Sequence, residues 1–209
     1  MHTIASALIE QRIIPVLRLK SRALAERGIA ALAEAGFGSV EITLTTPDAL
    51  ALIRAQRTTA PSGLLVGAGT VLDLDSARAC LDAGAQYLVS PCVVPGMGEL
   101  AHAAGAACLA GAFTPGEVLA AWRSGADVVK VFPASTGGPA HLAALHAVFP
   151  HIPLCPTGGV NLDNVEDWRR AGAAVVGVGN HILDLAALEA GDLARVIAHA
   201  ARFLGRQQA

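Results

Sequence analysis

Apolar and polar positions along the chain follow two patterns that alternate eight times. Short runs rich in valine, isoleucine and leucine, which are typical of buried strands, each precede a longer stretch with the spacing of an amphipathic helix. The predicted strands cover residues 13–19, 39–44, 64–70, 87–91, 107–113, 128–133, 153–159 and 174–180. This alternation indicates a parallel sheet whose strands are connected by helices.

Glycines and capping residues mark the ends of the predicted helices. A glycine just past a helix adopts the left-handed conformation without a Cβ penalty. Short motifs such as AEAG and LDAG place one at Gly36, Gly84, Gly105, Gly125 and Gly172. Residue types that start helices follow several strands, namely Thr46 with Pro47, Asp73, Thr114 with Pro115, and Asn161. Each unit is therefore one strand and one helix joined by short loops.

Eight such units in 209 residues predict a (β/α)8 barrel, preceded by a short N-terminal helix and forming a single domain over residues 1–209. A doubly wound open sheet is the alternative. The barrel is preferred because no GxGxxG motif opens a helix after the first strand. The glycine-rich VGAGT segment ends at Thr70 and lacks a third glycine, so it is a weak dinucleotide-binding signal.

Composition and charge narrow the range of partners. Hydrophobic residues make up 53% of the chain and charged residues 15%, which indicates a well-packed globular protein. A net charge of -2 without a basic stripe argues against binding to nucleic acid or to an anionic membrane. No apolar run reaches the about 18 residues of a membrane span. The N-terminal MHTIASALIEQR fits an amphipathic helix better than a signal peptide, so we expect a cytoplasmic protein.

The cysteines and histidines predict neither disulfides nor a metal site. Cys80, Cys92, Cys108 and Cys155 occur singly, and in a core-rich chain of this size we expect reduced, buried thiols. The seven histidines show no zinc-ligand spacing such as HExxH. We therefore expect neither a metal nor a cofactor.

Two charged residues interrupt the apolar strands: Glu41 in SVEITL and Lys130 in VVKVFP. Because an unpaired charge out of water costs several kcal/mol, each needs a partner or a function. Their strands, the second and the sixth, face one another across a closed barrel. The pair is either a structural salt bridge or an active site, in which a desolvated lysine amine attacks a carbonyl and glutamate transfers protons. The second interpretation predicts a Schiff-base lyase.

Candidate binding groups lie at the ends of other strands. The segments PTGGV (156–160) and GVGN (177–180) end the last two strands, where barrels bind phosphate through backbone amides, although such glycines also permit tight turns. Arg18 closes the first strand and either clamps a substrate carboxylate or folds over the rim. Thr70 has a hydroxyl that can bind the same carboxylate.

The segments EITLTTPDAL, VGAGTVLD, LVSPCVVP, VKVFPAS and CPTGGVNLDNVEDW, in this order and spacing, resemble the bacterial 2-keto-3-deoxy-6-phosphogluconate (KDPG) aldolases, which often also cleave 4-hydroxy-2-oxoglutarate (KHG). The resemblance runs from Ile13 to Leu183. It implies a metal-free class I aldolase on a (β/α)8 barrel, typically a homotrimer. Such an enzyme releases pyruvate and glyceraldehyde 3-phosphate from KDPG, and pyruvate and glyoxylate from KHG.

The resemblance also implies roles for individual residues. Lys130 would form the Schiff base, Glu41 would act as acid and base, and Thr70 would bind the pyruvoyl carboxylate. Gly158, Gly159 and Gly179 would lie in the phosphate-binding loops. The expected substrate-binding set is completed by Arg18, Thr45, Pro91, Phe132, Thr157 and Asn180. The expected partner is a small, phosphorylated 2-oxo acid.

Three positions depart from the pattern of the better-known members. Thr45 stands where many have a carboxylate-binding arginine, and Arg18 is expected to take over that task. Asn180 stands where many have a phosphate-binding serine. Ser135 stands where the gluconate enzymes usually have glutamate, which is more similar to the aldolases of 2-keto-3-deoxy-6-phosphogalactonate. The configuration at C4 and the phosphorylation of the substrate therefore stay open.

Two other functions remain open. One is a barrel isomerase or synthase that binds phosphorylated substrates without forming an imine. The other is a non-catalytic barrel that binds a metabolite. The first would use the same glycine loops for phosphate but would form no imine at Lys130.

Overall fold

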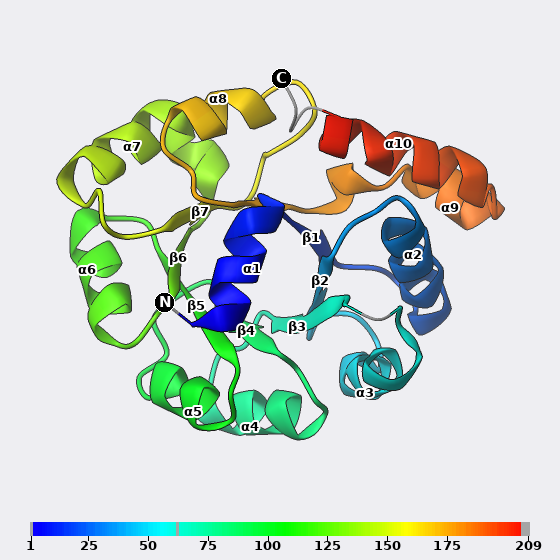
Figure 1. The fold of residues 1–209 in the computed structure, drawn as a ribbon, viewed down its shortest axis with the longest axis horizontal. Coiled ribbons are helices and arrows are strands. Elements are labelled where there is room, and N and C mark those ends of the chain that lie inside the picture. Colours follow the sequence, from blue (N-terminus) through cyan, green and yellow to red (C-terminus); the bar gives the residue numbers. More distant parts are fainter. Residues whose placement is uncertain (1, 62, 206–209) are drawn as a thin grey trace.

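Eight parallel strands surrounded by helices form the protein (Figure 1), whose computed structural model describes residues 2–61 and 63–205. The strands are β1 (Ile13–Leu17), β2 (Ser39–Thr43), β3 (Leu65–Gly69), β4 (Tyr87–Val89), β5 (Ala107–Ala112), β6 (Val128–Val131), β7 (Leu154–Pro156) and β8 (Val176–Val178). The helices are α1 (Thr3–Gln11), α2 (Arg22–Glu34), α3 (Ala49–Thr59), α4 (Leu74–Asp82), α5 (Met97–Ala103), α6 (Pro115–Arg123), α7 (Ala134–Val148), α8 (Val165–Arg170), η1 (Asn180–Ile182), α9 (Leu185–Ala190) and α10 (Leu193–Gly205).

The sheet closes on itself. The strands pair in the order β7-β6-β5-β4-β3-β2-β1-β8. Isolated bridges from Leu154 to Ala173 and from Thr157 to Gly177 join the two outer strands, and the Ala174 amide donates to the Leu154 carbonyl at 2.9 Å. The predicted (β/α)8 barrel is therefore confirmed, and the open doubly wound sheet is excluded.

The strands are shorter than the apolar runs predicted, because several of those runs continue into the loops at the carboxyl ends of the strands. Arg18 lies one residue beyond β1, and Thr70 lies one residue beyond β3. Thr70 has a φ of 61°, a left-handed conformation that is rare for a β-branched residue. Both side chains are thus placed at the mouth of the barrel.

The predicted helix boundaries hold at some positions and fail at others. All five glycines predicted to end helices have positive φ angles. Asp73 caps α4 by accepting from the Ser76 amide at 2.6 Å, and Thr114 forms a capping box with Glu117 at the start of α6.

The predictions that helices start at Thr46 with Pro47 and at Asn161 were wrong. Helix α3 begins after Asp48 and α8 begins after Asn164. The Thr46 hydroxyl instead lies 3.4 Å from the Leu19 amide and from the Leu17 carbonyl. The Asn161 side chain accepts from the amides of residues 163 and 164 within its own turn. Both side chains therefore stabilise loops rather than helix starts.

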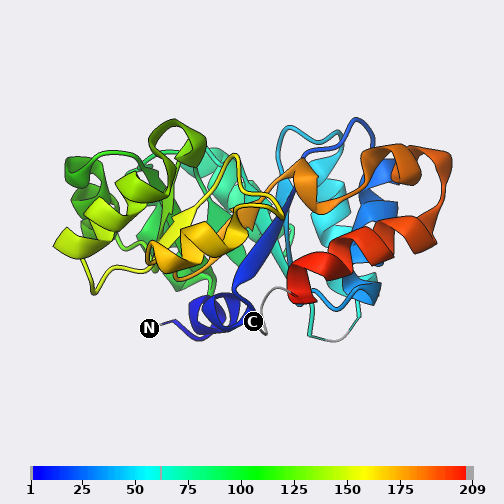
Figure 2. The same ribbon diagram turned by 90° about the horizontal axis from the view of Figure 1, so that it is seen from above.

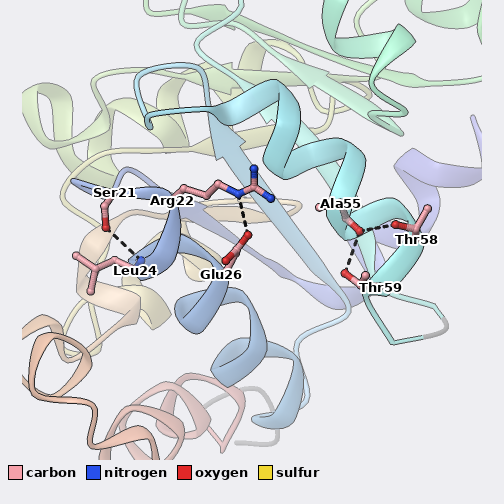
Figure 3. Close-up of polar contacts among 7 residues, drawn as sticks. All are labelled: Ser21, Arg22, Leu24, Glu26, Ala55, Thr58 and Thr59. Carbon is pink, nitrogen blue, oxygen red and sulfur yellow. Dashed lines mark hydrogen bonds and ion pairs between the residues drawn. The ribbon is translucent and has the colours of Figure 1, made fainter.

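Helices α2 and α3 cover β1, which leads to Arg18, and β2, which carries Glu41. At the start of α2, the Ser21 hydroxyl accepts from the Leu24 amide, and Arg22 pairs with Glu26 at 2.8 Å (Figure 3). At the end of α3, the hydroxyls of Thr58 and Thr59 donate to the Ala55 carbonyl (Figure 3). Such local bonds satisfy backbone groups that helix ends otherwise leave unpaired.

The N-terminal helix α1 lies across one end of the barrel (Figure 2). Its buried residues Ala5 and Leu8 pack against side chains that fill the barrel interior, among them Ile14 and Tyr87. Gly67 makes room for the Tyr87 ring, since a Cβ at this glycine would lie 2.1 Å from it. The interior is therefore filled at this end, and an open site is left to the opposite end, where the strands finish.

Three of the four cysteines are buried, as predicted, but Cys92 is exposed because it lies in the loop after β4. Burial raises the pKa of Cys80 to about 11 and those of Cys108 and Cys155 to about 12, which keeps these thiols protonated. Within the described residues, no helix combines the length and the apolar character needed to cross a membrane.

Candidate active site

A cavity of about 270 Å³ opens at the carboxyl ends of the strands. Residues from or just after six of the eight strands form its wall. They are Val16, Arg18, Glu41, Thr43, Thr70, Lys130, Phe132, Thr157, Gly158, Gly159, Gly179, Asn180 and His181. The structure therefore gathers ten of the twelve predicted site residues around one space.

Lys130 and Glu41 form the floor of this cavity from opposite sides. Strands β2 and β6 lie four positions apart in the eight-stranded order, so the two side chains approach from facing walls. Lys130 is 6% exposed and Glu41 is 3% exposed. The Lys130 Nζ lies 5.3 Å from the centre of the Phe132 ring, a contact that attracts an ammonium group. The two charged groups are thus withdrawn from bulk water but open to the cavity.

The interpretation of this pair as a structural salt bridge is not supported. The ion pairs found in the described parts of the chain do not include Glu41 with Lys130. Within the same residues, Glu41 Oε1 is buried without a hydrogen-bond partner. A charge pair retained only for stability is expected to bond directly, because that contact must offset the cost of desolvation.

Burial raises the pKa of the Glu41 carboxyl, while the positive charges of Lys130 and Arg18 lower it to a smaller extent. Desolvation dominates because the carboxylate loses water without gaining a direct hydrogen bond at Oε1. The carboxyl therefore keeps its proton to higher pH than an exposed glutamate. A carboxyl group held in this way can donate a proton and, once ionised, accept one.

Gly69 makes the position of Glu41 possible. The two residues are on neighbouring strands, and a Cβ at Gly69 would lie 1.9 Å from Glu41 Oε1. Any side chain at this position would displace the carboxyl from the cavity floor. The second glycine of the VGAGT segment thus provides the space that the Glu41 carboxyl occupies.

We expect Gly69→Ala to destabilise the fold by about 1–3 kcal/mol, as overpacking does, and to lower kcat about 10-fold by moving Glu41. Thermal unfolding and steady-state kinetics measure the two effects. Gly116→Ala is the matched control, because a Cβ there meets no atom within 4 Å. Equal kinetics in the two variants would contradict the role given to Gly69.

The rim next to Glu41 carries Arg18 and Thr70. Arg18 is exposed, and its charge reaches Glu41 strongly enough to lower the pKa of that carboxyl. Thr70 holds its strained left-handed backbone at the cavity wall. Strain of this kind persists where the surrounding structure imposes it, often at functional sites. Together these residues offer a guanidinium and a hydroxyl to an anionic group.

The opposite part of the rim consists of backbone rather than side chains. Gly158 and Gly159 follow β7 with φ angles of 96° and 81°, and Gly179 follows β8 with no atom within 4 Å of a Cβ placed on it. Asn180 is exposed beside them. Because glycines have no side chain, an anionic group can approach the main chain closely on this polar surface.

Two of the predicted substrate-binding residues lie outside the cavity wall. Thr45 lines a separate, open hollow, and its hydroxyl lies 2.9 Å from that of Thr43. Pro91 borders a smaller hollow of about 170 Å³, which Phe132 shares. Pro91 also packs against Gly111, where a Cβ would lie 2.0 Å from the Pro91 carbonyl carbon.

Three wall residues were not among the predicted site residues: Val16, Thr43 and His181, although Thr43 is one of the few polar residues of the predicted strands. Val16 and Thr43 share the strand periodicity of Arg18 and Glu41, so alternation along β1 and β2 could have identified them. His181 lies in the three-residue 3-10 helix η1 after β8, which is too short to show a periodic pattern in the sequence.

Comparison with known proteins finds similarity to aldolases of one family. The family model described as KDPG and KHG aldolase matches residues 4–199. A probable 2-dehydro-3-deoxy-6-phosphogalactonate aldolase of Rhizobium meliloti is 38% identical, over 83% of this chain and 82% of its own. A 2-dehydro-3-deoxy-phosphogluconate aldolase of Pseudomonas aeruginosa is 37% identical, over 90% of this chain and 85% of its own.

One solved structure resembles this chain along most of the length of both proteins. It is the KDPG aldolase of Legionella pneumophila, with pyruvate captured at low pH as a covalent carbinolamine intermediate. The likeness has a TM-score of 0.86 and 28% identity, and it covers 94% of this chain and 96% of that one.

Proposed function

Because the chain belongs to the KDPG and KHG aldolase family, we propose that it is a class I aldolase that cleaves 2-keto-3-deoxy-6-phosphogluconate to pyruvate and glyceraldehyde 3-phosphate. The observation that carries this proposal is the buried amine of Lys130, facing the acid of Glu41 across one cavity. In the same way, the enzyme releases pyruvate and glyoxylate from 4-hydroxy-2-oxoglutarate.

The first steps join the substrate to Lys130. The unprotonated amine adds to the C2 carbonyl and forms a carbinolamine, the kind of intermediate captured in the Legionella enzyme. Loss of the C2 hydroxyl as water requires a proton, which Glu41 donates. The pKa of Glu41, raised by burial, favours a protonated carboxyl for this step. The product is a protonated imine between Lys130 and C2.

The cleavage step uses the imine as an electron sink. Glu41, now ionised, accepts the proton of the C4 hydroxyl, and the electron pair of the C3–C4 bond moves into the imine to form an enamine. The aldehyde leaves from C4. Glu41 then returns its proton to C3, and hydrolysis of the resulting imine releases pyruvate and regenerates Lys130.

The cavity rims bind the two ends of the substrate in this proposal. Arg18 and Thr70 hold the carboxylate next to C2, because they lie on the Glu41 side of the cavity. The glycine loops at Gly158, Gly159 and Gly179, with the Asn180 side chain, hold the phosphate. Thr157 and Phe132 line the wall between, near Lys130.

A second candidate substrate is the C4 epimer, 2-keto-3-deoxy-6-phosphogalactonate. It is favoured by Ser135, which packs against the phosphate loop: its amide donates to the Gly158 carbonyl at 3.0 Å. The relative from Rhizobium meliloti carries the galactonate name. Measuring kcat/KM for both C4 epimers tests which of the two is the preferred substrate, since the preferred epimer has the higher value.

We also propose that the enzyme is a homotrimer, as the resemblance implies, and that it is located in the cytoplasm.

Trapping with borohydride tests the imine directly. We expect pyruvate plus borohydride to add one covalent group, found by intact mass and peptide mapping at Lys130. Lys20 is the other lysine of the chain. It is an internal control, because its side chain is 86% exposed and its Nζ lies 3.3 Å from Glu189. An adduct at Lys20, or none at saturating pyruvate, would leave a non-imine synthase or a binding protein as the better interpretation.

We expect Arg18→Ala to lower kcat/KM for the 2-oxo acid about 10- to 100-fold, since a hydrogen bond to a charged group contributes roughly 1.5–3 kcal/mol. Weaker pyruvate binding accounts for most of this loss. Adding Thr45→Arg to that variant is expected to restore part of it, because β1 and β2 are adjacent.

Arg22→Ala is the matched control for the Arg18 variant, since Arg22 pairs with Glu26 on the outer surface (Figure 3). Pyruvate affinity unchanged by Arg18→Ala would reduce Arg18 to a residue that covers the rim. In that case Thr70 and backbone amides hold the carboxylate.

A further inference from the structure

His181 is a wall residue of the cavity to which the proposed mechanism gives no role. It lies in the short turn η1 directly after Asn180, and its side chain is exposed at the same rim as Gly158 and Gly179. It therefore stands where the substrate end farther from C2 is expected.

The fold uses the backbone of His181 but not its ring. Its carbonyl accepts a hydrogen bond from His199 Nε2 at 2.9 Å, and the next residue, Ile182, is fully buried. Among the described residues, no hydrogen bond, ion pair or ring contact is found for the His181 imidazole itself. By contrast, the rings of His102 and His141 bond to Asp127 and to a backbone carbonyl. A fixed backbone thus presents a ring with two free nitrogens to the cavity.

Of the basic residues in the cavity wall, one has no assigned partner and is available to an anionic group at the substrate end far from C2. Three basic residues line the wall: Arg18, Lys130 and His181. Lys130 is the proposed nucleophile on the floor, and Arg18 is assigned to the carboxylate. The glycine amides and Asn180 are neutral donors. The acidic residue of the wall, Glu41, is 3% exposed on the floor, so no carboxylate of the wall competes at the rim.

We propose that His181 binds the phosphate of the aldehyde fragment and makes the enzyme select phosphorylated over unphosphorylated aldehydes. This inference rests on the proposed aldolase function. A basic side chain next to Asn180 adds a further hydrogen-bond donor for the phosphate beside the neutral amide. Histidine is suited to this task because its ring nitrogens can donate hydrogen bonds to phosphate oxygens.

The addition reaction tests this proposal without a choice of C4 epimer. With pyruvate saturating, KM and kcat are measured for glyceraldehyde 3-phosphate and for glyceraldehyde. We expect His181→Ala to raise KM for the phosphorylated aldehyde about 5- to 20-fold, with kcat and the constants for glyceraldehyde nearly unchanged. His181→Lys, which places a positively charged donor at the same position, is expected to recover most of the loss.

The matched control is His151→Ala, since His151 is exposed and lies outside the cavity wall. Equal losses on both aldehydes, or no loss on the phosphorylated one, would overturn the role of His181. Borohydride trapping of pyruvate at Lys130 is run on the same proteins. If the parent forms the adduct and His181→Ala still prefers glyceraldehyde 3-phosphate over glyceraldehyde as strongly as the parent, only this inference fails. If the parent forms no adduct, the proposed function itself fails.

Discussion

Replacing Lys130 with methionine is expected to abolish aldol cleavage, with kcat lowered about 10⁴-fold or more, the order found when a covalent nucleophile is removed. Methionine keeps the length and the apolar stem of lysine but cannot form an imine. Because Lys130 is buried in β6 between valines, removing its charge also removes a desolvation cost, so the variant is expected to fold. The measurement is pyruvate release coupled to a dehydrogenase, with circular dichroism as the check on folding.

Lys20→Met is the matched control for the Lys130 variant. Lys20 lies on the surface and pairs with Glu189, so its loss is expected to leave turnover unchanged. Cleavage within 10-fold of the parent in a folded Lys130→Met protein would exclude the Schiff-base mechanism for this chain.

Replacing Glu41 with glutamine is expected to lower kcat by about 10²-fold or more while pyruvate still forms some imine with Lys130, since one positioned acid–base group contributes a factor of this order. Glutamine has nearly the same shape and fits the space over Gly69, so a change in packing does not account for the loss. Single-turnover cleavage and borohydride trapping measure the two steps separately. Unchanged cleavage would make Glu41 a structural residue.

The Glu41→Gln variant is expected to lose activity but to gain thermal stability as the pH rises. Burial raises the pKa of Glu41 in the folded state above its ordinary value of 4.5, so the folded protein holds the proton more tightly than the unfolded chain. The contribution of this carboxyl to stability is therefore fully present below about pH 4.5, and it is lost as the pH rises through the folded-state pKa. Glutamine does not ionise and shows no such loss.

We therefore expect the Tm of Glu41→Gln to exceed that of the parent increasingly as the pH rises above about 4.5, and to match it near pH 4. Thermal unfolding of both proteins across this range measures the difference. A constant difference in Tm would show that the Glu41 proton is held equally in the folded and unfolded states.

Local sequence patterns determined the order of the elements. Apolar runs alternating with amphipathic stretches, together with glycines such as Gly36 and Gly172, depend on interactions within a few residues, and these can be read along the chain. Glu41 and Lys130 were found for the same reason: a charge inside an apolar strand is conspicuous without a structure. The resemblance to the aldolases added roles that the pattern alone left open.

Tertiary structure alone decided how these groups meet. The space at Gly69 for the Glu41 carboxyl, the left-handed backbone of Thr70 and the position of Thr45 in a separate hollow depend on which strands are neighbours and how their loops pack. His181 reaches the cavity because the short helix η1, held by the bond from His199 and by the buried Ile182, presents it there. Contacts between residues far apart in sequence, which no local period encodes, set these positions.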